Sequence, residues 1–247
     1  MSSSPRLPPE LEQEIFLLAF HSDGAEVNRL CLVAKRVLDW LIPHRYHVVI
    51  LSAGRYSPIK FNETVYKKYG HHVRHLLLED DQAREHLHLF PNVVNLAFWG
   101  SNEHTAIDLP PLLQLPLTCI SIAFYPNLFR LFAKVTHLDL TTGFHHESTS
   151  IGSLLYLPKL THVCVPSKFS LELFLERERC PQLRVAIVWG LGSGGGVDGG
   201  MSVRDKRVVM VRCDPHTDWE IGARGGLDMW RLAEGLISSR NGHRAEI

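Results

Sequence analysis

Apolar side chains in the first fifty residues recur at the spacing of short helices and then give way to a strand-like run. The first helix is marked by Leu11, Ile15 and Leu18, and the second spans Val27 to Ala34. A third short helical turn covers 39–42 and is stopped by Pro43. The strand-like run is His47 to Leu51. Three short helices of this length have little interior of their own, because a unit of about 45 residues is marginal on its own. We therefore expect their apolar stripe to pack on the rest of the chain or on a partner.

The middle of the chain repeats a different pattern, with apolar residues at i, i+3 and i+5. The copies are Val73/Leu76/Leu78, Val93/Leu96/Phe98, Leu117/Ile120/Ile122, Val135/Leu138/Leu140, Leu160/Val163/Val165 and, more weakly, Leu183/Ala186/Val188. Their starting points differ by 20, 24, 18, 25 and 23 residues. Intervals of this size resemble degenerate leucine-rich repeats, in which each strand sends alternate side chains into a shared core. The alternative is a parallel α/β sheet without true repeats.

The repeat turns depart from that family. The asparagine or cysteine expected eight residues after each first anchor is absent, so we expect irregular convex loops and a short or imperfect solenoid. Segments 85–90 and 169–179 can form short outer helices. Histidines 75, 137 and 162 each precede the second anchor of a repeat, and we interpret them as exposed strand positions that point away from the core.

The last part of the chain predicts one more strand and a closing helix. Residues 207–212 read as the strand, and Asp228 is a candidate N-cap for a helix over 229–239. We expect Trp219 and Trp230 to anchor this helix on the last repeat, where it would cap the open end of the core.

The N-terminal residues resemble the F-box over positions 5–50. The string Leu7-Pro8-Pro9-Glu10-Leu11, the pair Ile15-Phe16 and the block from Leu30 to Arg36 follow the family pattern, as in the variants abundant in mushroom-forming fungi. Ala34 stands where cysteine is usual, and Val37 occupies the tryptophan position. The alternative is an ordinary helical cap at the N-terminus.

The resemblance implies a substrate-receptor subunit of a cullin-type SCF ubiquitin ligase. Such a protein is not an enzyme: it has no catalytic residue, cofactor or metal and acts by position. Its partners would be a Skp-family adaptor, a cullin reached through that adaptor, and an unknown protein target bound by the repeats. The adaptor contacts carried over are Leu7, Pro8, Leu11, Ile15, Phe16, Leu30, Val33 and Lys35. The alternative function is a repeat-based interaction scaffold that assembles no ligase.

The amino-acid composition argues against several classes of binding partner. The chain has 247 residues, with 26 basic and 26 acidic side chains that cancel, so no overall field recruits nucleic acid or an anionic membrane. No apolar run reaches the roughly 20 residues of a membrane span, and the N-terminus lacks the pattern of a secretory signal. Five scattered cysteines without a C-x-x-C pair indicate reduced thiols. We expect a cytoplasmic or nuclear location.

Two sequence patterns suggest a dinucleotide site or a metal site, but each lacks a feature that such a site requires. Residues 190–195 satisfy G-x-G-x-x-G after a strand, but the sequence that follows is a poor helix former, so we favour a Gly-rich linker over a dinucleotide site. Fifteen histidines invite a metal hypothesis, yet none has the H-E-x-x-H spacing.

The predicted fold is therefore α/β: a three-helix F-box, a short irregular leucine-rich-repeat-like solenoid and a C-terminal capping helix. The corresponding segments are 1–52, 53–190 and 191–247, the last of which holds the Gly-rich linker, the final strand and the helix.

Overall fold

The computed structural model describes most of the chain, and every structural statement below concerns these residues. They are 7–22, 27–51, 61–79, 81–99, 109–122, 129–140, 156–166, 168–176, 178–189 and 205–242. The G-x-G-x-x-G motif at 190–195 and the histidines at 145 and 146 lie outside them.

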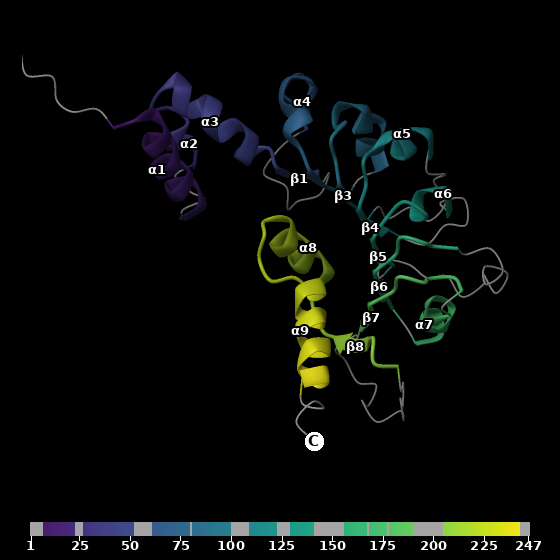
Figure 1. Cartoon of the computed structure of the whole chain (residues 1–247). Helices are drawn as coiled ribbons and strands as arrows, with labels where there is room; N and C mark the ends of the chain where they lie inside the picture. The colour runs from purple at the N-terminus through teal and green to yellow at the C-terminus, as the bar shows by residue number, and fades with distance from the viewer. Residues whose placement is uncertain are drawn as a thin grey trace, which may run out of the picture.

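One parallel sheet organises the molecule (Figure 1). Its strands are β1 (Val48–Leu51), β2 (His75–Leu78), β3 (Asn95–Phe98), β4 (Cys119–Ile122), β5 (His137–Asp139), β6 (His162–Val165), β7 (Val185–Trp189) and β8 (Val208–Val211). They lie side by side in chain order, and every neighbouring pair is parallel. Each inner strand therefore hydrogen-bonds to the strands that precede and follow it in the sequence, while β1 and β8 form the edges.

The first face of the sheet is covered by the segments that connect the strands. These are α4 (Glu63–Tyr69), η1 (Gly70–His72), η2 (Asp81–Leu89), α5 (Leu109–Gln114), α6 (Phe129–Phe132) and α7 (Lys168–Leu175), where η denotes a 3-10 helix. All six predicted apolar triplets are buried here in one continuous core. The prediction that these side chains point inward is confirmed, because the second and third members of each triplet lie two residues apart on a strand or, for Leu140, directly after one.

The second face is covered by helices from the end of the chain, α8 (Pro215–Ala223) and α9 (Met229–Gly242) (Figure 1). Trp219 and Ala223 of α8 pack against Leu77 and Ala97, while α9 lies against β7 and β8. The N-cap prediction for α9 is confirmed, since the backbone N–H of Arg231 donates to Asp228 Oδ1 at 2.9 Å. Trp219, however, contacts β2 and β3 and not the last strands.

The fold prediction is correct in its class, α/β, and wrong in its architecture. The three-helix F-box, leucine-rich-repeat-like solenoid and C-terminal cap are replaced by one eight-stranded all-parallel sheet with helices on both faces. A capping helix would pack on the last strand, at the end of a solenoid. Instead, α8 and α9 lie across the second face of the sheet, which carries no covering helix in a solenoid. The absence of the repeat-turn asparagines agrees with this outcome.

The N-terminal helices join the sheet without a break. They are α1 (Pro9–Ser22), the four-residue α2 (Val27–Leu30) and α3 (Lys35–Arg45), and α3 leads directly into the edge strand β1. Pro43 was expected to end the third helix but lies inside it. It is tolerated because it falls in the last turn, where the lost N–H removes only one hydrogen bond and the Tyr46 N–H still donates to Ile42 O at 3.1 Å.

Candidate functional site

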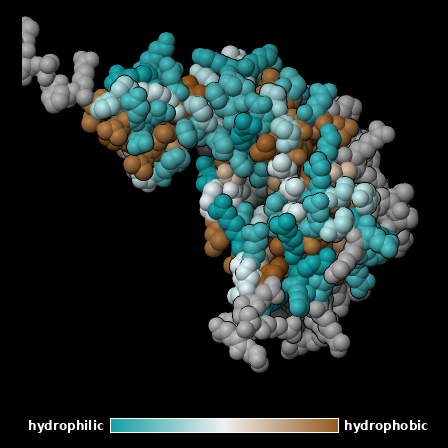
Figure 2. All heavy atoms as spheres, in the orientation of Figure 1, coloured by the Kyte–Doolittle hydropathy of each residue, from teal (hydrophilic) through white to brown (hydrophobic). Residues whose placement is uncertain are grey.

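An apolar surface on the N-terminal helices is the first candidate site. Several large apolar side chains there are exposed: Leu7 just before α1, Leu11, Ile15 and Leu18 along α1, and Leu32 and Val33 at the turn before α3. We call these six residues the apolar face. Brown atoms gather on this part of the molecule, which projects from one end of the sheet (Figures 1 and 2). Leu11 and Ile15 are 47% and 52% exposed, and Val33 is 61% exposed.

Four of the eight predicted adaptor contacts, Leu7, Leu11, Ile15 and Val33, belong to the apolar face. Leu7, Pro8, Leu11, Ile15, Val33 and Lys35 are all exposed. Phe16 and Leu30 are different, because both are half-buried and pack with Cys31, Val37 and Leu41 inside the N-terminal helices. The structure thus divides the predicted set into six residues available to a partner and two that hold the helices together.

The interior of these helices is small. Its fully buried side chains are Val37 and Leu41, with Cys31 at the edge, and α1 contributes half-buried Phe16, Leu17 and Phe20. Val37, which departs from the F-box tryptophan, lies in this interior. The Arg36 guanidinium donates to Glu12 Oε1 at 2.5 Å and joins α3 to α1. A core this small leaves the opposite side of α1 without an intramolecular partner among the described residues.

A row of polar side chains crosses the second face of the sheet and is the second candidate site. His75, Asn95, Cys119, His137 and His162 occupy one register position on five adjacent strands, β2 to β6. We call them the polar row. The prediction that the three histidines point away from the first-face core is confirmed, but their expected exposure is wrong. His162 is buried and the other two are half-buried, because α8 and α9 cover this face.

Two tryptophans and one glutamate of the covering helices contact the side chains of the polar row. The rings of His137 and His162 stack with centroids 4.1 Å apart, and Trp230 packs edge-on against both. His162 Nε2 lies 3.1 Å from Glu234 Oε1, while Trp219 Nε1 donates to Asn95 Oδ1 at 3.1 Å. Trp230 therefore lies over β5 and β6, and Trp219 anchors α8 rather than α9.

Burial keeps these histidines neutral at pH 7. Desolvation, followed by the neighbouring imidazole, lowers the pKa of His75 and of His137 to about 4. Desolvation also lowers the pKa of His162, although Glu234 opposes the shift. The row acts as a neutral hydrogen-bonding lining between sheet and helices.

A cavity of about 240 Å³ lies under α8, next to the polar row. In its wall, Ser121 Oγ donates to Asp139 Oδ2 at 2.6 Å and accepts from Trp99 Nε1 at 3.1 Å. The hydroxyl is thus committed to a carboxylate directly, without the intervening histidine of a catalytic triad. Burial raises the pKa of the Cys119 thiol, which is the opposite of the shift that activates a cysteine nucleophile.

One carboxylate of this cavity, that of Asp218, lies where burial and neighbouring carboxylates disfavour its negative charge. Asp218 of α8 accepts the backbone N–H of Met229 at 3.1 Å. Desolvation, reinforced by Asp228, Asp139 and Asp214, raises its pKa from 3.8 to about 6 in spite of that hydrogen bond.

The remaining sequence signals give no site within the described residues. There, no group of three or more histidine, cysteine, aspartate or glutamate side chains is placed to hold a metal ion. His86, for example, stacks on Phe61 with ring centroids 4.1 Å apart. The described part of the chain also contains no helix long and apolar enough to span a membrane.

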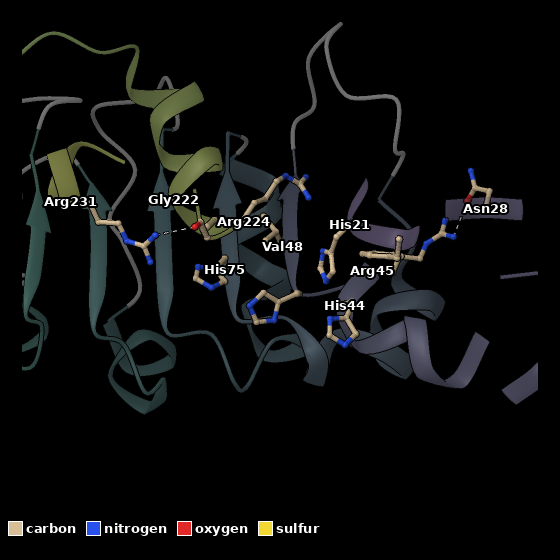
Figure 3. A pocket seen from close by; sticks show the side chains of 13 residues that line it. His21, Asn28, His44, Arg45, Val48, His75, Gly222, Arg224 and Arg231 are labelled. Atoms are coloured by element: carbon tan, nitrogen blue, oxygen red, sulfur yellow. Dashed lines mark hydrogen bonds between the residues drawn. The ribbon is translucent and has the colours of Figure 1, made fainter. Parts of the chain in front are cut away.

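Sequence reasoning missed the covered face and a cleft beside it. The cleft, of about 1130 Å³, lies between the N-terminal helices and the end of α8. It joins residues distant in the sequence, among them Arg45, Arg224 and Arg231, so no local spacing could reveal it (Figure 3). The sequence does contain one signal of the polar row: each of its three histidines directly precedes the second apolar residue of a triplet.

Comparison with protein-family models, with curated proteins and with solved structures finds no match to this chain.

Proposed function

We propose that this protein is a substrate-receptor subunit of a cullin-type SCF ubiquitin ligase. The apolar face would dock on a Skp-family adaptor, and the sheet with its covering helices would bind the protein target. The observation that carries the proposal is the exposure of Leu11 and Ile15 on α1 and of Val33 in the turn before α3, all residues of the F-box-like sequence in a part of the chain that projects from the sheet.

Physical chemistry supports a docking role for this surface. Leu11, Ile15 and Leu18 follow one another at helical spacing along α1, so their exposed side chains form a continuous stripe. A contiguous exposed apolar stripe indicates a protein-binding surface, because water contact with it is unfavourable. An amphipathic helix that presents i, i+4 and i+7 anchors to a partner groove is a recurrent recognition mode.

The proposed contribution to ubiquitin transfer is positional. By holding the target close to a ubiquitin-charged enzyme, the receptor would raise the effective concentration of target lysines. No group of this chain would take part in bond chemistry. The N-terminal helices project from one end of the sheet, so a partner docked on them would leave α8 and α9 uncovered (Figure 1).

Substitution of the apolar face tests the proposal in the full-length chain. Leu11→Asp with Ile15→Asp removes two exposed anchors and leaves half-buried Phe16 in place, so the helices should remain folded. Burying half of each leucine or isoleucine side chain contributes roughly 1 kcal/mol, so the pair accounts for about 30-fold in affinity before the cost of desolvating the new carboxylates. Binding to a purified Skp-family adaptor is measured by calorimetry.

A matched control uses two leucines of α9. Leu232 and Leu236 are 41% and 38% exposed and lie far from the apolar face, so Leu232→Asp with Leu236→Asp should leave adaptor affinity unchanged. If the wild-type protein does not bind, or if the α1 pair binds as tightly as wild type, the proposed docking surface is wrong. Adaptor binding without recruitment of a cullin would indicate the non-ligase scaffold instead.

A truncation that begins at Ala53 is a poor alternative test. It removes β1, which pairs with β2 and contributes Val49 and Leu51 to the first-face core. Loss of binding would then follow from damage to the sheet as well as from loss of the helices, so full-length variants are preferable.

A further inference from the structure

The cavity under α8 has no role in the proposed docking of an adaptor. It lies between the polar row and the junction of α8 with α9, and its volume is about 240 Å³. Close packing leaves few voids larger than a water molecule between packed elements, so a hollow of this size is not a packing gap. Pockets for drug-sized ligands have about 300–1,000 Å³, so this cavity fits a somewhat smaller molecule.

Carboxylates from three different elements line the cavity. Asp139 comes from β5, Asp218 from α8 and Asp228 from the turn before α9. The described residues of the wall include no arginine or lysine. The two imidazoles, of His75 and His137, are neutral at pH 7, because burial lowers the pKa of both to about 4. No cationic side chain among these residues therefore balances the carboxylates.

Neutral donors hold the two carboxylates of the covering helices. Asp218 Oδ2 accepts the backbone N–H of Met229 at 3.1 Å, and Asp228 Oδ1 accepts that of Arg231 at 2.9 Å. The second oxygen of each carboxylate accepts no further hydrogen bond from the described residues. Each carboxylate is thus fixed in place and retains an oxygen for a ligand.

The surroundings of Asp218 favour a positive ligand. The neighbouring charges that act on it are those of Asp228, Asp139 and Asp214, and all have the same sign as its own. Gly222 allows this crowding, since a Cβ there would stand 2.6 Å from Asp228 Oδ2. A cation placed among these carboxylates would relieve their mutual repulsion, which is strong where water is partly excluded.

Two indole rings complete the wall, those of Trp219 and Trp230. Trp219 Nε1 donates to Asn95 Oδ1 at 3.1 Å, and Trp230 packs edge-on against the rings of His137 and His162. These contacts hold both indoles in position before a ligand binds. Among aromatic side chains tryptophan attracts cations most strongly, and its apolar surface suits a short carbon chain.

We propose that this cavity binds a small protonated primary amine, with its ammonium group held by Asp218 and Asp228 and its carbon chain against Trp219 and Trp230. An ammonium group has three N–H donors, which match carboxylate oxygens from two elements at once. Hydrogen bonds between an ammonium and a carboxylate are charge-assisted and stronger than neutral ones. The ligand would also join α8 to the turn before α9.

Other classes of ligand fit the cavity less well. A metal ion needs several ligating side chains already grouped, and no group of three occurs among the described residues. An anion would meet carboxylates in a wall whose described residues include no arginine or lysine. A neutral molecule would leave the like charges around Asp218 unbalanced.

Three probes of similar size test the proposal with the full-length protein. They are n-butylammonium, 1-butanol and butyrate, which share a carbon chain and differ in charge. Binding is measured by calorimetry at pH 7 and constant ionic strength. We expect only n-butylammonium to bind saturably, with a Kd of about 1 mM or tighter, an affinity within reach of a ligand of this size.

Asp218→Asn removes one of the two charged acceptors and keeps an oxygen for the Met229 N–H, so the variant should fold. Its affinity for n-butylammonium should be roughly 10- to 100-fold lower, as expected for one hydrogen bond to a charged group. The matched control is Glu172→Gln, which removes an exposed carboxylate of α7 on the first face of the sheet. This control should bind as the wild type does, and thermal unfolding without ligand checks that both variants are folded.

Acid should weaken the binding through the same residue. Burial and the neighbouring carboxylates raise the pKa of Asp218 to about 6, so most molecules carry a neutral Asp218 at pH 5. The affinity of the wild type for n-butylammonium should then be roughly tenfold lower at pH 5 than at pH 7, while that of Asp218→Asn should change much less.

The indole N–H resonances provide a second measurement. Those of Trp219 and Trp230 should shift when n-butylammonium is added, and that of Trp40 in the N-terminal helices should not. The proposal is overturned by equal binding of the three probes, by no saturable binding up to about 20 mM, or by equal affinities of Asp218→Asn and wild type. Equal weakening by Glu172→Gln, or shifts that leave Trp219 and Trp230 unchanged, would overturn it as well.

Amine binding is independent of the proposed adaptor docking. Leu11→Asp with Ile15→Asp should lose the adaptor and retain n-butylammonium. Asp218→Asn should lose n-butylammonium and retain the adaptor.

Discussion

Replacing Asp218 by asparagine is expected to stabilise the protein at neutral pH. The asparagine keeps an oxygen that accepts the Met229 N–H, at present 3.1 Å from Asp218 Oδ2, and removes a negative charge that is partly desolvated beside Asp228 and Asp139. Substituting a carboxylate usually weakens a protein when that carboxylate is favourably paired. The raised pKa of Asp218 indicates that its negative charge is unfavourable in the folded protein, so removing that charge should increase the free energy of unfolding.

The magnitude follows from the pKa of Asp218 in the two states. It is 3.8 in the unfolded reference and about 6 in the folded protein, and each pKa unit corresponds to 1.36 kcal/mol, so the full difference is about 3 kcal/mol. Because Asp218 retains some contact with solvent, screening reduces the expected gain to roughly 1–1.5 kcal/mol.

The pH dependence has a definite sign. Between pH 3.8 and about 6 the folded protein binds a proton at Asp218 that the unfolded chain has released. The free energy of unfolding of the wild type therefore falls as pH rises through this window. The advantage of Asp218→Asn should be largest at pH 7 and should shrink as pH falls towards 4.

Urea denaturation of both proteins at pH 7 and at pH 4.5 measures this difference directly. Other titrating groups are common to the two proteins and cancel in the comparison. A variant that is no more stable than the wild type at pH 7, or one whose advantage is the same at both pH values, would refute the assignment of a desolvated charge at Asp218.

Three further substitutions test local features of the fold. Asp214→Ala should lower the free energy of unfolding by about 1 kcal/mol at pH 7, because Asp214 Oδ2 caps α8 through the N–H and the hydroxyl of Thr217 at 3.0 and 2.6 Å. Since those bonds lower the pKa of Asp214, the loss should diminish as pH falls, and an equal loss at acid pH would contradict the cap. Gly70→Ala should destabilise the protein by roughly 1–3 kcal/mol, because a Cβ there would collide with the carbonyl oxygen of Leu89. Gly235→Ala, which meets open space within α9, should instead stabilise it by up to about 1 kcal/mol, and thermal unfolding of the two variants decides the point.

The first face of the sheet could be predicted from the sequence, and the second could not. The six triplets identify buried positions because a strand alternates its sides with period two, so the pattern at one strand is sufficient. The fate of His75, His137 and His162 depends on α8 and α9, which begin more than fifty residues after His162. No local pattern states which strands a remote helix will cover.

The candidate sites differ in the same way. Half of the apolar face, Leu11, Ile15 and Leu18, lies along α1, so helical spacing located these residues. The same spacing could not separate Phe16, which faces Val37 and Leu41, from its neighbour Ile15, because both are large and apolar. The arginines of the cleft come from α3, from the end of α8 and from α9, and only the folded chain brings them together.

The order of the strands also bears on how the chain folds during synthesis. Each strand pairs with its immediate predecessor, so the sheet can extend from β1 as the ribosome releases successive segments, with short loop closures at every step. The contact between Asn95 and Trp219 spans 124 residues and forms only after α8 has emerged. Until then the polar row faces water on the nascent chain. On strands β2 to β6 the row thus places hydrophilic side chains beside apolar ones such as Leu77 and Ala97, which also stay uncovered until α8 arrives.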